Sequence, residues 1–411
     1  MDAELLSAEF HRRFGHAPLL VRAPGRINLI GEHTDYNLGF VLPGAIDRAI
    51  YFAIACNHQQ EARLIAYDDQ QDTLIIPVSS VTAGEKQWAN YLLGVIAQFQ
   101  QRGILVPGFD CIFGGDIPLG AGLSSSAALC CGFAFALNHL LDSGLDELTL
   151  AKMAQSAEHT YAGVRTGLMD QFASLFGKAG HVVRLDCRSL DYDYYPFDTA
   201  ACNIVLCNSG VKHSLASTEY NTRRRECEQG VDVLKRHYTE VSSLRDVTLA
   251  QLDAQLEHLG PVIYKRCKYV VEENHRVEAA SQALNESDLT TVGQLMFASH
   301  AGLRDEYEVS CCELDVLVEA ARHLPGVFGA RMMGGGFGGC TINLVTPEHV
   351  PAFERGLSTG TRPITGNISH GSGRWRFTCR SRFNCLDIEQ CQTPPASLPL
   401  PNNRTVATIR C

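Results

Sequence analysis

The run Pro118-Leu119-Gly120-Ala121-Gly122-Leu123-Ser124-Ser125-Ser126-Ala127-Ala128-Leu129 places two glycines and three consecutive serines between two apolar segments. Residues 109–113 before it alternate apolar and polar side chains, which predicts a half-buried strand. Residues 127–141 are almost all apolar and too many for one strand, which predicts a buried helix. The glycines let the backbone turn tightly and approach a ligand. A strand, a glycine loop and a helix N-terminus together predict an anion site, usually for phosphate.

Two other phosphate motifs do not fit this loop. The P-loop pattern Gly-x-x-x-x-Gly-Lys-Ser/Thr does not occur in the chain, and the dinucleotide fingerprint needs a third glycine where the loop has Ser125. A capped helix after a tight turn is the simpler structural alternative, because serine hydroxyls cap the unpaired N–H groups of a first helical turn. Three serines in a row favour the phosphate site, since one cap needs only one hydroxyl.

Length and composition limit the function classes. With 411 residues the chain is long enough for two domains, and its net charge of −10 argues against nucleic acid or an anionic membrane as a partner. The acidic start Met1-Asp2-Ala3-Glu4 predicts no signal peptide, and residues 127–141 are too few for a membrane span. Most of the 16 cysteines lie inside apolar segments without Cys-x-x-Cys pairs, so we expect reduced thiols and a cytoplasmic protein.

A second polar cluster lies near the amino terminus, within Gly25-Arg26-Ile27-Asn28-Leu29-Ile30-Gly31-Glu32-His33-Thr34-Asp35-Tyr36. Apolar side chains in this segment can anchor it in a core. The arginine, the imidazole and the two carboxylates would then offer donors and acceptors together, as the hydroxyls of a polyol require. A charged surface loop is the alternative, which the interleaved apolar residues disfavour.

This segment closely resembles the galactokinase signature. Pro118–Leu129 resembles the phosphate loop shared by the galactokinase, homoserine kinase, mevalonate kinase and phosphomevalonate kinase (GHMP) superfamily. A third superfamily motif is similar to Met332-Met333-Gly334-Gly335-Gly336-Phe337-Gly338-Gly339-Cys340. The three occur in the family order, and the similarity runs through most of residues 8–355. The resemblance implies an α+β, two-domain GHMP-kinase-like fold with the active site in the interdomain cleft.

The resemblance also implies a reaction, the transfer of the ATP γ-phosphoryl group to the anomeric hydroxyl of galactose. It implies Asp170 as catalytic base and Arg26 as its partner and charge stabiliser. The implied sugar contacts are Arg26, Glu32, His33, Thr34, Asp35, Gly167, Asp170 and Tyr220. ATP would bind at Gly120, Ala121, Gly122, Leu123, Ser124, Ser125 and Ser126, and Mg²⁺ at Ser126 and Glu158, because a hydroxyl and a carboxylate suit a hard cation. The expected partners are galactose and ATP, with no nucleic acid and no membrane, and the expected state is a monomer.

Two other functions are compatible with the motifs. An N-acetylgalactosamine kinase could share all three and would differ in the room beside the second carbon of the sugar. A non-catalytic sugar and ATP sensor of galactokinase ancestry is the alternative outside enzymes. Such sensors can lack residues of the phosphate loop, whereas 124–128 are intact here, which favours catalysis.

The sequence predicts three regions: a sugar- and phosphate-binding domain over 1–190, a C-terminal kinase domain over 191–356 and a divergent tail over 357–411. The tail contains no Lys, seven Arg, one Asp and one Glu, with a proline-rich run at 394–401. No stretch of it has a regular apolar period. We therefore expect it to be disordered or the product of a frameshift, and to lack the helix and last strand with which galactokinases normally continue.

Overall fold

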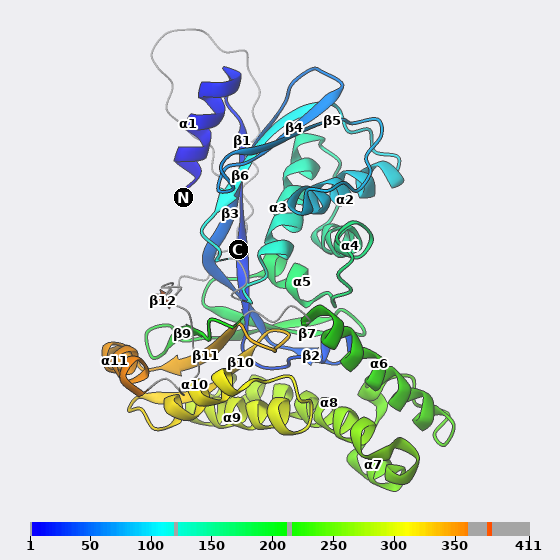
Figure 1. Cartoon of the computed structure of the whole chain (residues 1–411), viewed down its shortest axis with the longest axis vertical. Helices are drawn as coiled ribbons and strands as arrows, with labels where there is room; N and C mark the ends of the chain where they lie inside the picture. The colour runs from blue at the N-terminus through cyan, green and yellow to red at the C-terminus, as the bar shows by residue number, and fades with distance from the viewer. Residues whose placement is uncertain (1, 119–121, 212–215, 361–375, 380–411) are drawn as a thin grey trace.

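The computed structural model describes residues 2–118, 122–211, 216–360 and 376–379 (Figure 1). Its N-terminal half is built on a five-stranded sheet and its C-terminal half on a four-stranded sheet, with helices packed on both. Figure 1 shows the two halves at opposite ends of the long axis of the molecule. The expected two-domain α+β fold is confirmed.

The N-terminal sheet has the strand order β1-β3-β6-β4-β5, and all its neighbours are antiparallel except the parallel pair β4–β6. Its strands are β1 (Leu19–Asn28), β3 (Pro43–Cys56), β4 (Glu61–Ala66), β5 (Asp72–Pro77) and β6 (Phe109–Gly115). The strand expected at 109–113 is thus confirmed. Because Pro24 interrupts β1 before the register shift at Arg26, the strand bends at the point where the polar signature begins.

Helices cover both faces of this sheet. Helix α1 (Ala3–Phe14) lies alone on one face and inserts Leu6 and Phe10 against the strands. The other face carries α2 (Gln87–Gln101), α3 (Ser125–Leu140), α4 (Glu147–Ala157) and α5 (Met169–Phe176). Helix α3 is the central one and is buried on nearly every side, as the apolar run at 127–141 predicts. The glycine loop therefore leads from β6 into the most buried helix of the half.

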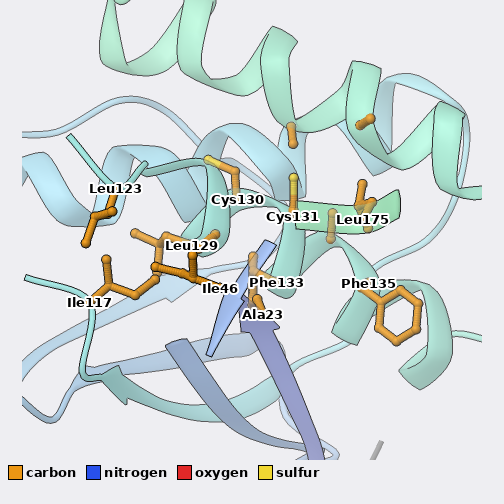
Figure 2. Close-up of a cluster of buried hydrophobic side chains, with 14 of the residues drawn as sticks. Ala23, Ile46, Ile117, Leu123, Leu129, Cys130, Cys131, Phe133, Phe135 and Leu175 are labelled. Atoms are coloured by element: carbon orange, nitrogen blue, oxygen red, sulfur yellow. The ribbon is translucent and has the colours of Figure 1, made fainter. Parts of the chain in front are cut away.

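Close contact between α3 and the sheet depends on one glycine. In Figure 2, Phe133 of α3 and Ala23 of β1 lie together in the apolar cluster. At Gly132, a Cβ atom would lie 2.4 Å from the ring of Phe52 and 2.5 Å from Cβ of Ala23. Only glycine lets the helix backbone approach the strands this closely.

A three-stranded sheet of β2 (Phe40–Val41), β7 (His181–Asp186) and β8 (Tyr192–Pro196) follows the N-terminal half. The C-terminal sheet has the order β10-β11-β9-β12, with β9 (Asn203–Asn208), β10 (Val327–Met333), β11 (Cys340–Val345) and β12 (Arg376–Cys379). Its helices are α6 (Ala216–Lys235), α7 (Leu249–Ala254), α8 (Leu256–Asn285), α9 (Leu289–Asp305), α10 (Cys312–Arg322) and α11 (Val350–Gly360). The proposed domain boundary at residue 190 falls in the turn between β7 and β8.

The absence of regular structure expected from residue 357 onward is wrong for two segments. Helix α11 continues to Gly360, because Val350, Phe353 and Leu357 form one apolar stripe that crosses the expected boundary and packs in the C-terminal core. Residues 376–379 form β12, antiparallel to β9. An exposed strand edge offers backbone donors and acceptors to a passing segment, and this pairing needs no apolar period. The rest of the expected disordered or frameshifted tail, 361–375 and 380–411, lies outside the described residues.

The twelve cysteines from Cys56 to Cys340 are all free, so the expectation of reduced thiols holds for this part of the chain. Burial raises the pKa of several of these thiols, that of Cys340 to about 12. Across the ranges that the structure describes, no helix is both long and apolar enough to cross a membrane.

Replacing Gly132 by alanine should destabilise the protein by about 1–3 kcal/mol, because the added methyl group overpacks the contact with Phe52 and Ala23. The better helix propensity of alanine, worth at most about 1 kcal/mol, would not offset this cost. Urea denaturation should show a lower midpoint with an unchanged slope. The matched control is Gly84→Ala, where a Cβ meets no atom within 4 Å. Equal or higher stability of Gly132→Ala would contradict the packing argument.

Candidate active site

An ion pair joins the first motif to the start of α5. Arg26, in β1, donates from Nε to Oδ1 of Asp170 at 2.8 Å, and both side chains are largely buried. The second nitrogen, Nη1, donates to the backbone oxygen of Gly122 at 2.5 Å. The backbone of the same residue also bonds the loop, because the Arg26 N–H donates to the carbonyl of Leu123. Arg26 therefore holds the base candidate and the glycine loop in one place.

The loop serine nearest this pair does not cap its helix. Ser124 occupies the N-cap position of α3 with a left-handed φ of 54°, yet its side chain makes no capping hydrogen bond. Its Oγ donates instead to Oδ2 of Asp170 at 2.5 Å. The alternative of a simple capped helix is thus wrong for Ser124, because the left-handed backbone turns the hydroxyl toward the carboxylate. Both oxygens of Asp170 are consequently hydrogen-bonded.

Ser126, in α3, and Glu158, directly after α4, also lie close to each other. Oγ of Ser126 lies 3.4 Å from Oε2 of Glu158, while Gln171 donates to the other oxygen at 2.9 Å. Glu158 begins a single π-helical turn at 158–162, an irregularity that often marks functional sites. Burial, followed by repulsion from Asp170, raises the pKa of Glu158 to about 8. Arg26 offsets this only in part, and no ion pair to Glu158 forms among the described residues.

The acidic residues of the first motif differ in their contacts. A Cβ on Gly167 would lie 2.0 Å from Oδ2 of Asp35, so Gly167 and Asp35 are in direct contact and glycine is required there. Burial, then repulsion from Asp170, raises the pKa of Asp35 to about 7. The Thr34 hydroxyl is used inside its own loop, within 2.9 Å and 2.6 Å of the backbone oxygens of Gly31 and Phe40.

Glu32 connects the first motif to the glycine-rich third motif. Its Oε1 accepts from the backbone N–H of Gly334 at 2.8 Å and from Nη2 of Arg331 at 3.1 Å. Arg331 is completely buried and also donates to the carbonyls of Asn28 and Leu29. Sequence reasoning missed Arg331, although a lone arginine in the apolar strand β10 was a usable signal, because a buried charge needs a partner.

The imidazole of His33 lies in a cage of aromatic rings. Its ring centroid is 5.8 Å from that of Tyr36, 5.2 Å from that of Tyr220 and 4.9 Å from that of Tyr307. Its Nδ1 is 2.7 Å from the Tyr36 hydroxyl. Burial lowers the pKa of His33 to about 3, which keeps the ring neutral. Tyr36 and Tyr307 were not among the expected site residues.

The three motifs converge. A Cβ on Gly122 would lie 3.6 Å from the carbonyl oxygen of Met333, and one on Gly335 would lie 3.3 Å from the ring of Tyr220. The third motif therefore lies beside both the phosphate loop and the aromatic cage. Of the expected nucleotide-binding residues, Gly120 and Ala121 lie outside the described residues. Ser125 is the first residue of α3.

The arrangement has the elements of a transfer reaction. A carboxylate fixed by an arginine and a serine can accept a proton, and a helix N-terminus such as that of α3 offers backbone donors to an anion. Acidic, imidazole and phenol groups lie beside it, as a polyhydroxylated acceptor requires. In the described part of the chain, no group of three or more His, Cys, Asp or Glu side chains is arranged to hold a metal ion on its own.

Known proteins share these motifs. The galactokinase galactose-binding signature matches residues 8–56, the GHMP kinase N-terminal domain matches 90–178 and the GHMP kinase C-terminal domain matches 280–360. The last match reaches beyond residue 355, where the similarity was expected to stop. The galactokinase of Chloroflexus aurantiacus is 44% identical over 368 residues, which cover 89% of this chain and 94% of that protein.

Two further similarities agree with these. The galactokinase of Thermotoga maritima is 44% identical over 324 residues, or 79% of this chain and 88% of that protein. The crystal structure of Lactococcus lactis galactokinase complexed with galactose matches with a TM-score of 0.83 and 33% identity, covering 87% of this chain and 93% of the other. With its three motifs in one site and this similarity over most of its length, the chain belongs to the galactokinase family of the GHMP kinases.

Proposed function

We propose that this protein transfers the γ-phosphoryl group of ATP to the anomeric hydroxyl of galactose. The observation that carries the proposal is the position of the Asp170 carboxylate, held by Arg26 and Ser124 directly beside the glycine loop. Family membership and the likeness to a galactokinase complexed with galactose support the choice of substrate. The chain thus combines a proton acceptor, a phosphate loop and a sugar signature.

Asp170 would accept the proton of the anomeric hydroxyl. The transition state of phosphoryl transfer is loose, so catalysis depends mainly on positioning and on stabilising charge. Arg26 pairs with the side chain of Asp170 and adds positive charge where the phosphoryl group passes. The hydroxyl of Ser124 orients the second carboxylate oxygen, so that the base faces the loop.

ATP would lie on the loop formed by Gly120, Ala121, Gly122, Leu123, Ser124, Ser125 and Ser126, at the N-terminus of α3. Ser126 and Glu158 fit a magnesium ion. Their oxygens are 3.4 Å apart, and neighbouring ligands of an octahedral Mg²⁺ lie roughly 3 Å apart. A cation would also compensate the buried carboxylate of Glu158. Held by these two residues, the ion would neutralise phosphate charge.

The sugar would be oriented by Glu32, His33, Asp35, Gly167 and Tyr220, whose atoms face one another around Asp170 and the aromatic cage. Thr34 would contribute its backbone, because its hydroxyl is engaged in the loop. No observation favours N-acetylgalactosamine as acceptor or a sensor without activity. An ADP-release assay over a sugar panel tests the proposal: galactose should give the highest turnover, and turnover of another sugar instead would overturn it.

The remaining expectations are also proposals. We expect a cytoplasmic monomer that binds neither nucleic acid nor membranes, divided near residue 190 into two domains. The net charge of −10 supports the absence of nucleic-acid and membrane partners, because like charge disfavours contact with polyanions. Light scattering on the purified protein measures the oligomeric state directly.

Replacement of Asp170 by asparagine should lower turnover by about 10²–10⁴-fold, because this is the range that general-base assistance contributes. Galactose should still bind, since the amide keeps the shape of the side chain. A coupled ADP-release assay measures turnover, and calorimetry measures binding. The control Asp193→Asn changes an exposed carboxylate and should leave both unchanged. Turnover of Asp170→Asn close to that of the wild type would remove Asp170 from the mechanism.

Replacement of Glu158 by glutamine should raise the magnesium concentration needed for half-maximal activity and should weaken ATP binding more than galactose binding. The amide lacks the charge that a hard cation prefers. A magnesium titration of activity measures the effect, with the exposed Glu228→Gln as control. An unchanged titration curve would leave Glu158 a purely structural residue.

Galactose binding should weaken as the pH falls through 7. Below its raised pKa of about 7, Asp35 is protonated and loses its charge and part of its acceptor capacity, so the apparent affinity follows the fraction of the ionised form. With that pKa, the dissociation constant should be about tenfold larger at pH 6 than at pH 8. Calorimetry of galactose binding in the absence of nucleotide measures the effect of Asp35 separately from any titration of Glu158. Asp35→Asn should bind weakly at both pH values, and a slope that persists in this variant would assign the titration to another group.

A further inference from the structure

A row of hydrogen bonds runs from the C-terminal half of the protein to the sugar site. Sγ of Cys227 lies 3.2 Å from the hydroxyl of Tyr307, which lies 2.9 Å from the hydroxyl of Tyr36, which lies 2.7 Å from Nδ1 of His33. These four residues come from α6, from the segment after α9, from the 3₁₀ turn Asp35–Asn37 and from the loop before that turn. The row therefore connects elements that are distant in sequence.

Tyr307 is the fixed member of this row. It is completely buried, and its ring packs against Tyr269 with a centroid distance of 4.7 Å. Its carbonyl accepts from Nε of Arg223 at 2.7 Å. With its ring and backbone both held, the hydroxyl has little freedom to move away from Tyr36.

The other end of the row points to a ligand. The His33 ring is only 4% exposed, and its Nε2 is a buried polar atom that lacks a hydrogen-bond partner among the described residues. The backbone of Gly335 lies near the ring and raises the pKa of His33, but it makes no hydrogen bond of regular geometry to this nitrogen. Buried polar atoms are nearly always paired in folded proteins, so a ligand hydroxyl would complete the pairing. It belongs to the same loop as Glu32 and Asp35, which in ionised form can only accept.

Counting hydrogens favours one direction of the row. The buried Cys227 keeps its proton, because burial raises the pKa of its thiol to about 12. If the thiol donates to Tyr307, Tyr307 to Tyr36 and Tyr36 to Nδ1 of His33, each hydrogen has an acceptor. In the opposite direction, the thiol hydrogen lacks an acceptor among the described contacts. The first direction leaves the His33 proton on Nε2.

We propose that Tyr307 is a positioning residue for the sugar: through Tyr36 it holds His33 in the tautomer whose Nε2–H donates to a hydroxyl oxygen of galactose. The inference rests on the proposed function, because it takes the sugar as the missing partner. A hydroxyl that gives its hydrogen to a carboxylate still has oxygen lone pairs to satisfy. The Nε2–H group supplies a donor beside acceptor-only side chains.

The test is Tyr307→Phe, with Tyr194→Phe as the matched control. Tyr194→Phe also removes one hydrogen bond, which the Tyr194 hydroxyl donates to the carbonyl of Phe176 at 2.8 Å and which lies outside the row. Tyr307→Phe should raise the galactose KM roughly three- to tenfold, as loss of one hydrogen bond does. It should leave kcat and the ATP KM within twofold, because only sugar binding is affected. Tyr194→Phe should leave all three constants unchanged.

Nitrogen-15 NMR of histidine-labelled protein reads the tautomer directly, with His33→Gln to assign the signal. The wild type should show the proton on Nε2, and Tyr307→Phe should show a mixture of tautomers. In the His33→Gln background, Tyr307→Phe should raise the galactose KM no further, because both changes remove the same interaction. A purely structural role would give the same fold-change in both backgrounds and an unchanged tautomer, which would overturn the proposal.

Cys227 allows the same test from the other end of the row if Tyr307→Phe does not fold. Cys227→Ala should shift the His33 tautomer, whereas Cys227→Ser keeps a donor and should restore the wild-type signal. Wild-type signals from both variants would overturn the proposal. Failure of the proposed function is a separate result, because it would appear as absence of galactose-dependent ADP release by the wild-type protein.

Discussion

The site depends on the burial of one arginine among carboxylates. Arg26 is the cation that pairs with Asp170, while Asp35 and Glu158 lie near enough to Asp170 for it to raise their pKa values. Taking charges out of water is costly unless each is paired and hydrogen-bonded. The same arginine donates to the carbonyl of Gly122, so the side chain that compensates the buried negative charge also fixes the position of the phosphate loop.

A second buried arginine makes the two halves of the molecule interdependent. Arg331 connects β10 with the carbonyls at the end of β1 and with the carboxylate of Glu32. Glu273 of α8 adds a parallel connection, because it accepts from the backbone N–H of Gly31 and from Ser299. The loop that carries the sugar-binding residues is therefore held from the C-terminal half at several points. Its left-handed His33 can persist only because its surroundings fix it.

Local patterns were enough to predict the elements around the phosphate loop. The alternation at 109–113 predicted β6, and the apolar run at 127–141 predicted α3. Strand β1 was hidden by Pro24 and Gly25, which are rare inside strands. The resemblance to the family named Arg26, Asp170, Ser126 and Glu158, which lie in contact as two pairs, but it did not name the other contacts of these side chains. Glu32 contacts Arg331, and His33 is connected to Tyr307 through Tyr36. Arg331 and Tyr307 lie about 300 residues further along the chain, beyond the reach of any local sequence pattern.

The contact between Glu32 and Gly334 also has a consequence for synthesis of the chain. The two residues are 302 positions apart, so Glu32 emerges from the ribosome long before β10 is synthesised. Until then the nascent N-terminal half carries a carboxylate without its arginine, a state that disfavours compact packing around the sugar loop. Contacts of such long range form late, because loop-closure entropy must be overcome first. The sugar site should accordingly be among the last parts of the protein to form, and truncated chains would lack it even where their own half is folded.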